Sequence, residues 1–119
     1  MIGQRNMSIL RRNFMKLFIS QGMRGKTNED ILAERNKAIK IFKEMFSNED
    51  IEVLDSFFKD GIEPEDVSAS GVWWLGKSLE LLAKADVAYF VGNWQDYRGC
   101  RIEHTVCKEY GIKTIGKGV

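Results

Sequence analysis

Short apolar runs alternate with segments of helical periodicity along this chain, and that order restricts its possible folds more than any other feature. The runs, which have the composition of buried strands, are residues 16–20, 51–55, 86–91 and 112–115. The segments between them, in which apolar residues recur at helical spacing, are residues 28–46, 71–84 and 98–110. A regular alternation of strand and helix predicts a parallel sheet with helices on both faces.

The length of 119 residues fits one domain and leaves no room for two. We therefore expect residues 15–119 to form a single α/β domain, a flavodoxin- or Rossmann-like three-layer sandwich with a reduced, four-stranded parallel sheet. Residues 1–14 precede the first clear element, and we expect them to be an extension that is either frayed or packed on a partner subunit.

Charge and composition exclude several classes of protein. The net charge is +1, so neither a nucleic acid polymer nor an acidic membrane is an expected partner. No stretch reaches the length of a membrane span, and the first residues lack the long apolar core of a signal peptide. We expect a cytoplasmic protein.

Cysteine and histidine usage gives no sign of a metal or a cofactor. Cys100 and Cys107 are separated by about 10 Å if they share a helix, which is too far for a disulfide. The chain has no C-x-x-C motif and a single histidine, His104, for which we expect a surface or subunit-contact role.

Ligands of such sheets bind beyond the carboxyl ends of the strands. The segments expected to meet there are residues 21–26, 56–66 and 92–103. In the first of them, Gly22 and Gly25 bracket Arg24 just before a helix. The exposed backbone N–H groups, the arginine and the helix N-terminus together could bind an anion. An ordinary glycine-containing turn with a solvent-exposed arginine is the alternative interpretation of the same residues.

Acidic side chains give the second group of candidates. Glu103 lies one turn into the expected helix 98–110, where the helix dipole favours an ionised carboxylate that can act as a nucleophile. A solvent-facing glutamate is the alternative. Asp55 ends the second expected strand and either binds a sugar hydroxyl or caps a turn. The pair Trp73 and Trp74 belongs to the core or stacks on a base.

Four stretches, LFISQGMRGKTNEDILAERNKAI, VLDSFF, LGKSLELLAKADVAYF and RGCRIEHTVCKEYGIK, carry a resemblance to a known family. Together they resemble a small, often phage-encoded family of unknown function. That family is similar to the nucleoside 2-deoxyribosyltransferases and the deoxynucleoside 5′-monophosphate N-glycosidases. The resemblance covers residues 16–115 and implies an enzyme of the N-glycosidic bond that needs no cofactor.

The resemblance also implies roles for individual residues. The stretch YRGCRIE stands where those enzymes have a pattern like S-x-G-x-x-x-E, so Glu103 is implied as the catalytic nucleophile. The stretch SQGMRG is similar to a phosphate-binding turn, G-S-I-R-G-G, and is one residue longer. The residues implied or suggested for phosphate or nucleotide binding are Ser20, Gln21, Gly22, Met23, Arg24, Gly25, Asp55, Ser78, Tyr97, Arg98 and Gly99.

Two departures from the enzymes' pattern leave the function open. Ser78 stands where they carry an assisting aspartate, and a serine hydroxyl is too weak an acid to replace it. Tyr97 replaces the leading serine of the pattern, and Arg98 or Arg101 is the expected substitute for its phosphate contact. The hypotheses are therefore a nucleotide N-glycosidase or deoxyribosyltransferase, a nucleotide-binding protein without turnover that sequesters its ligand, and a purely structural or partner-binding phage protein.

The expected partners are a small nucleotide or nucleoside and further copies of the chain. The resemblance implies a homodimer or a larger homo-oligomer. Four aromatic residues exceed what one small core readily buries and favour the same conclusion; they are Phe57, Phe58, Trp73 and Trp74. The base, the sugar and the choice between hydrolysis and transfer are not encoded in any motif of the sequence.

Overall fold

The computed structural model describes residues 14–57 and 62–119, and every structural statement below concerns those residues. The elements, in chain order, are β1 (Phe14–Ser20), α2 (Asn28–Met45), β2 (Asp50–Val53), α3 (Ser70–Leu82), β3 (Val87–Phe90), the 3₁₀ helix η1 (Trp94–Asp96), α4 (Arg98–Tyr110) and β4 (Lys113–Gly116). Within the described residues no helix is long and apolar enough to cross a membrane.

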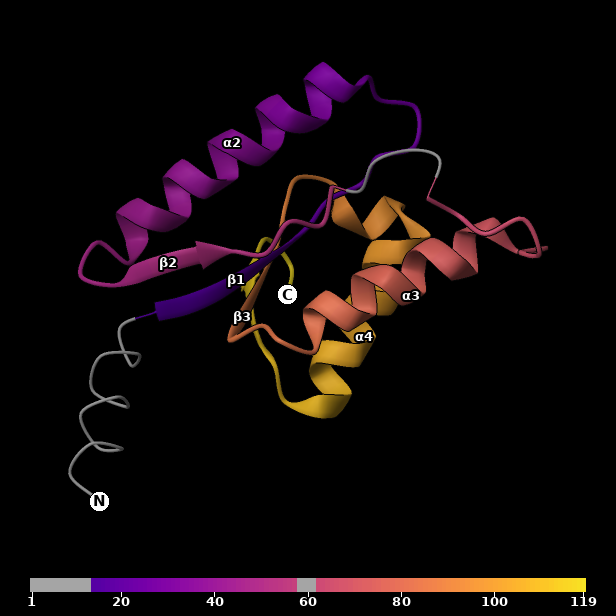
Figure 1. Cartoon of the computed structure of the whole chain (residues 1–119). Coiled ribbons are helices and arrows are strands. Elements are labelled where there is room, and N and C mark those ends of the chain that lie inside the picture. The colour runs from indigo at the N-terminus through magenta and orange to yellow at the C-terminus, as the bar shows by residue number, and fades with distance from the viewer. Residues whose placement is uncertain (1–13, 58–61) are drawn as a thin grey trace.

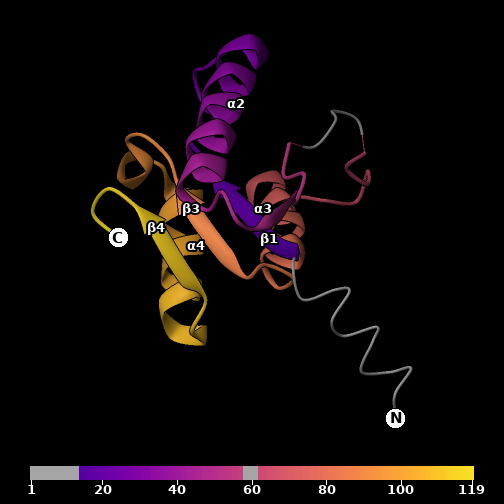
Figure 2. The ribbon, with the colours of Figure 1, turned by 90° about the vertical axis from the view of Figure 1, so that its left-hand side faces the viewer.

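The four strands form one parallel sheet in the order β2-β1-β3-β4. Helix α2 covers one face of this sheet, and helices α3 and α4 cover the other (Figures 1 and 2). The predicted Rossmann- or flavodoxin-like α/β fold is therefore confirmed, with three layers and a four-stranded sheet.

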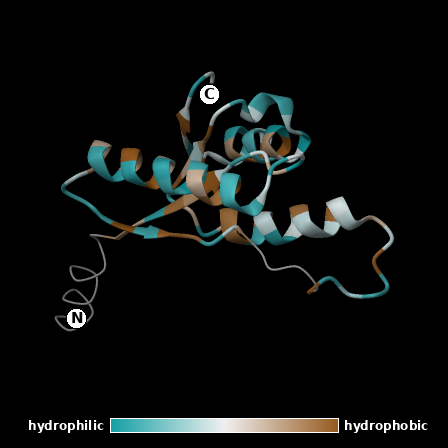
Figure 3. Ribbon diagram, turned by 90° about the horizontal axis from the view of Figure 1, so that it is seen from above, coloured by the Kyte–Doolittle hydropathy of each residue, from teal (hydrophilic) through white to brown (hydrophobic). Residues whose placement is uncertain are grey.

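Alternation of side chains along β1 divides the core between the two faces. Leu17 and Ile19 pack with Phe42 of α2, whereas Phe18 packs with Leu82 and the residues of α4. Hydrophobic residues concentrate on the strands, whereas α2 and α4 carry many hydrophilic residues (Figure 3). A sheet with both faces covered needs strands that are apolar on both sides, which explains the nearly unbroken apolar runs in the sequence.

The ends of the helices agree closely with the sequence. Thr27 caps α2, because its hydroxyl accepts a hydrogen bond of 3.1 Å from the backbone N–H of Asp30. Gly111 ends α4 in the left-handed conformation, with φ of 73°, which a glycine adopts without strain. The first strand, however, begins at Phe14, two residues before the predicted start, so the described domain includes the last residue of the predicted extension.

The apolar stripe of α2 is buried only along its centre. Ile31, Ala38 and Phe42 are buried, whereas Ile41 and Met45, which share the same helical spacing of apolar residues, are exposed. The reason is that a four-stranded sheet is narrow, so residues at the margin of the stripe extend past it.

A charged residue, Arg35, occupies the centre of this stripe and is only 5% exposed. Its guanidinium donates to the hydroxyl of Ser56 at 3.1 Å and to the carbonyl of Leu54 at 2.8 Å. Burial lowers the pKa of Arg35, and the neighbouring charge of Asp55 opposes that shift. These bonds attach α2 to the segment that follows β2 and fix that segment at the carboxyl edge of the sheet.

The order of the strands reverses between β1 and β3, which lie side by side although α2, β2 and α3 separate them in the chain. The backbone N–H of Val91 donates to the carbonyl of Ser20 at 3.0 Å, so the two strands end together. This is the position at which parallel sheets bind ligands.

Candidate functional site

Glu103 lies on the inner side of α4, next to the end of β1. Its side chain is buried, with 7% of the residue exposed. The hydroxyl of Ser20, the last residue of β1, donates a hydrogen bond of 2.7 Å to its Oε1 atom. The alternative of a solvent-facing glutamate is therefore wrong.

Burial raises the pKa of Glu103 to about 7, since the charged carboxylate loses its contact with water. Hydrogen bonds from Ser20 and, secondarily, Ser78 act in the opposite direction, because both stabilise the ionised form. The carboxyl group is consequently divided between its protonated and ionised forms near neutral pH. A group in that state can serve as a nucleophile or a base once it is ionised.

A pocket of about 270 Å³ opens beside Glu103. It is lined by Gln21, Met23, Arg24, Tyr97, Arg98, Gly99, Cys100 and Glu103. The turn after β1 and the first turn of α4 thus meet around one carboxylate, as the sequence predicts. Two guanidinium groups give the pocket a positive character on the side away from the core.

Tyr97 forms one wall of this pocket, pressed against the backbone of Gly22. A Cβ atom at Gly22 would overlap the tyrosine ring, so only glycine fits there. The ammonium of Lys26 lies 5.2 Å from the centre of the same ring. The absence of a side chain at Gly22 therefore allows Tyr97 to pack on the backbone there. Tyr97 in this way connects the turn after β1 with the start of α4.

A buried polar network supports the turn from the side of α2. Gln21 donates from Nε2 to the carbonyl of Ile31 at 3.1 Å and to Oε1 of Glu34 at 2.9 Å. Glu34 also pairs with Lys26 at 3.1 Å. The Oε1 atom of Gln21 is buried without a hydrogen-bond partner among the described residues.

The helix N-terminus at the pocket belongs to α4, not to α2 as predicted. The first turn of α2 is already occupied by the Thr27 cap and contains the acidic residues Glu29 and Asp30. No described side chain caps α4, and a Cβ at Gly99 in its first turn would meet no described atom within 4 Å. Bare backbone N–H groups therefore lie at the pocket edge.

The remaining predicted residues lie outside this lining. Asp55 is exposed and accepts a hydrogen bond of 3.0 Å from the backbone N–H of Phe57, so it caps a turn. Ser78, in the middle of α3, points to Glu103 as a hydrogen-bond donor. Gly25 has φ of 80°, which suits the turn. Phe58 lies outside the described residues.

His104 is partly buried, so the predicted surface position holds only in part, and the predicted subunit-contact role stays a prediction. Its ring is partly buried and packs against Phe90 and Trp94, with ring centres 5.3 Å and 4.7 Å away. The reason is that η1 brings Trp94 back over α4, and the tryptophan covers the histidine.

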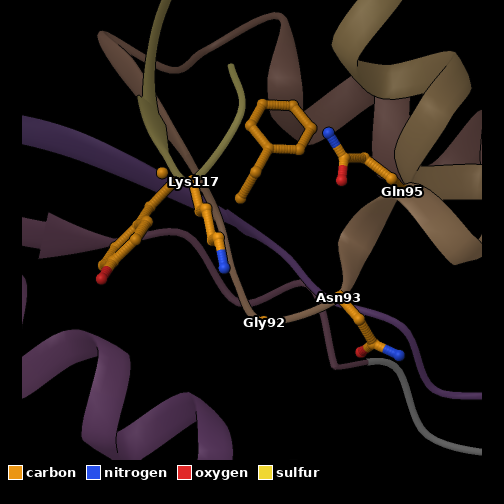
Figure 4. A pocket seen from close by; sticks show the side chains of 7 residues that line it. Gly92, Asn93, Gln95 and Lys117 are labelled. Atoms are coloured by element: carbon orange, nitrogen blue, oxygen red, sulfur yellow. The ribbon is translucent and has the colours of Figure 1, made fainter.

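A larger pocket of about 530 Å³ lies between the ends of β3 and β4. In Figure 4 the side chain of Lys117 points towards the segment at Gly92, whereas Asn93 points away from it. The polar side chains that line this larger pocket, Asn93, Gln95 and Lys117, are exposed, and no buried ionisable group lines the pocket. The smaller pocket is the better candidate, because it alone of the two contains a buried carboxylate.

Two residues near this carboxyl edge were not predicted as part of the site, although the sequence contains a signal for each of them. Arg35 interrupts the apolar stripe of α2 at a position that helical periodicity marks as buried. Lys117 stands between two glycines directly after the last strand, as Arg24 does after the first.

The fold and the site define a three-layer α/β protein with a buried glutamate at the switch point of its parallel sheet. Comparisons of the chain with known protein families, with curated proteins and with solved structures find no match. Among residues 14–57 and 62–119, no group of histidine, cysteine and acidic side chains is arranged to hold a metal ion.

Gly22→Ala should destabilise the protein by about 1–3 kcal/mol and weaken ligand binding, because the added methyl displaces Tyr97. Denaturant unfolding measures the first effect. Gly76→Ala in α3 is the matched control, since its Cβ would meet no described atom within 4 Å. The control should raise stability by about 0.5–1 kcal/mol, and equal effects of the two changes would contradict the proposed contact.

Proposed function

We propose that the protein cleaves, or transfers across, the N-glycosidic bond of a small nucleotide, with Glu103 as the nucleophile. The observation that supports this most directly is a buried carboxylate, hydrogen-bonded at one oxygen, beside a pocket with two arginines. Such a carboxylate matches what nucleophilic displacement at an anomeric carbon requires.

In the proposed reaction a carboxylate oxygen of Glu103 forms a bond to C1′ as the bond between C1′ and the base nitrogen breaks. The electron pair of that bond leaves with the base, which takes a proton from water. In the second step water attacks C1′, the ester to Glu103 breaks and a proton is released. A second base in place of water would give transfer.

The phosphate of the nucleotide would lie between Arg24 and Arg98, against the bare first turn of α4. Both arginines line the pocket, and Arg98 also reaches the first turn of α3 at Gly71. A guanidinium binds two phosphate oxygens at once, and backbone N–H groups complete the contact. Tyr97 would then border the sugar.

Arg24→Ala and Arg98→Ala should each weaken binding of a nucleoside monophosphate by about 10- to 100-fold. Binding of the matching nucleoside should change little, because it has no phosphate. Calorimetric titration of both ligands measures the difference. Lys37→Ala, which removes an exposed charge on α2, is the control and should alter neither affinity. A uniform loss for nucleoside and nucleotide would contradict the phosphate assignment.

The resemblance to nucleoside 2-deoxyribosyltransferases and deoxynucleoside 5′-monophosphate N-glycosidases supports the same reading, since Glu103 stands at the position of their nucleophile. Ser78 favours the second candidate, a nucleotide-binding protein without turnover. A serine cannot protonate a departing base near neutral pH, so a base that needs such help would remain attached.

Incubation of the protein with a panel of nucleosides, nucleoside 5′-monophosphates and NAD-derived nucleotides tests the proposal. Chromatography would follow the release of free base. Release from one compound supports the glycosidase, and exchange into an added base identifies a transferase. Retention of a compound without release supports the binding protein. The absence of both release and retention across the panel contradicts the nucleotide site.

Self-association belongs to this proposal and rests on α3. Val72 at its start is 68% exposed, and the rings of Trp73 and Trp74, each partly exposed, meet edge to face at 4.8 Å. Apolar surface of this kind suits contact with a second copy. Light scattering at micromolar concentration should give a dimer or a larger assembly, and a monomer would contradict the expectation.

A further inference from the structure

We infer that Ser20 is a positioning residue, which holds Glu103 by its Oε1 atom and so orients the carboxylate for attack on C1′. This inference rests on the proposed function. It assigns Ser20 a task different from the phosphate contact that its place in the SQGMRG turn implies.

The single hydroxyl proton of Ser20 supports this positioning role. A serine hydroxyl has one proton, and Ser20 donates it to Oε1 of Glu103 over 2.7 Å. It therefore has no proton left for a phosphate oxygen. The residue is also 1% exposed, so a phosphate in the pocket does not reach it.

The thiol of Cys100 is a second neighbour of the Ser20 hydroxyl. Burial raises the pKa of Cys100 to about 11, whereas the hydrogen bond with Ser20 lowers it. The thiol therefore keeps its proton at neutral pH, and no thiolate competes with Glu103 for the proton of Ser20. Cys100 and Glu103 of α4 therefore both lie beside Ser20 of β1, and the serine donates its proton to Glu103.

Ser20 is well placed to fix a carboxylate because its own backbone is rigid. It ends β1, where it pairs with Phe90 of β3, and its carbonyl accepts from the N–H of Val91 at 3.0 Å. Glu103 therefore takes its orientation from the sheet. A carboxylate held at one oxygen loses less freedom when it approaches the sugar.

Ser20→Ala should raise the midpoint of Glu103 ionisation by about one pH unit, because a hydrogen bond to the charged form is lost. Titration of the ¹³C-labelled glutamate carboxyl by NMR measures this shift without any substrate. The midpoint of kcat/KM against pH should move by the same amount. At pH 7 kcat should fall about fivefold, because the ionised fraction of Glu103 falls from about one half to about one tenth, and KM should change little.

Two further variants make the test specific. Ser20→Thr keeps the hydroxyl and should restore the midpoint. Thr105→Ala removes a hydroxyl that donates to the Arg101 carbonyl on the exposed side of α4, and should leave the midpoint unchanged.

If the alanine variant titrates within about 0.3 pH units of the wild type, the inference is overturned. If the midpoint moves but the wild type releases no base, the positioning of Glu103 stands and the proposed function fails. A rise in KM with kcat unchanged would return Ser20 to a ligand contact.

Discussion

Glu103→Gln is expected to abolish base release and to leave nucleotide binding within about tenfold of the wild type. The amide keeps the size of the side chain and can still accept the hydrogen bond from Ser20. It cannot form an ester with C1′, so the covalent route disappears. Removal of a nucleophile of this kind lowers kcat by at least about 10³-fold.

The matched control is Glu109→Gln, which alters an exposed glutamate on the same helix. It should release base at the wild-type rate. Mass spectrometry of acid-quenched wild type should also find a sugar phosphate on the peptide that contains residue 103, and the glutamine variant should lack it. Wild-type turnover in the glutamine variant would remove Glu103 from the mechanism.

The order of the elements was predictable because each signal for it is local. Within one segment, apolar residues that recur every two residues indicate a strand, and apolar residues that recur every three to four residues indicate a helix. The residue types of Thr27 and Gly111 mark the ends of two helices. Alternation then leaves little choice of topology. The length of β1 was less predictable, since Phe14 pairs with Asp50 of another strand.

The contacts of the site were not predictable, because they join distant residues. Ser20 and Glu103 are 83 positions apart, and no local pattern reveals that their side chains meet. The packing of Tyr97 on Gly22 is similarly remote. Position alone put Glu103 near the carboxyl edge, but its burial depends on how closely α4 lies on β1 and β3.

The burial of Glu103 also affects the stability of the protein, and this effect can be measured without a ligand. The carboxyl of an unfolded chain has an ordinary pKa of 4.5, whereas folding raises the pKa of Glu103 to about 7. Below pH 4.5 both states hold the proton and the group contributes no difference. Between the two values the unfolded state alone releases its proton, so the free energy of unfolding falls as the pH rises.

Glu103→Gln should therefore become more stable than the wild type as the pH rises from 4.5 to 8. At pH 8 the difference should approach about 3 kcal/mol, since one unit of pKa corresponds to about 1.4 kcal/mol. Other titrating groups cancel when the two proteins are compared. Urea unfolding at several pH values measures the difference, with Glu109→Gln expected to follow the wild type within about 0.5 kcal/mol.

Parallel stability curves for wild type and Glu103→Gln would mean that Glu103 ionises as it does in water. The carboxylate would then lack the buried surroundings on which the nucleophile assignment depends. A stability gain that builds up between pH 4.5 and about 7 would instead show that the fold loses stability by keeping a charge at this position. Such a loss of folding stability is characteristic of a site that acts on a ligand, because packing alone would favour a neutral side chain there.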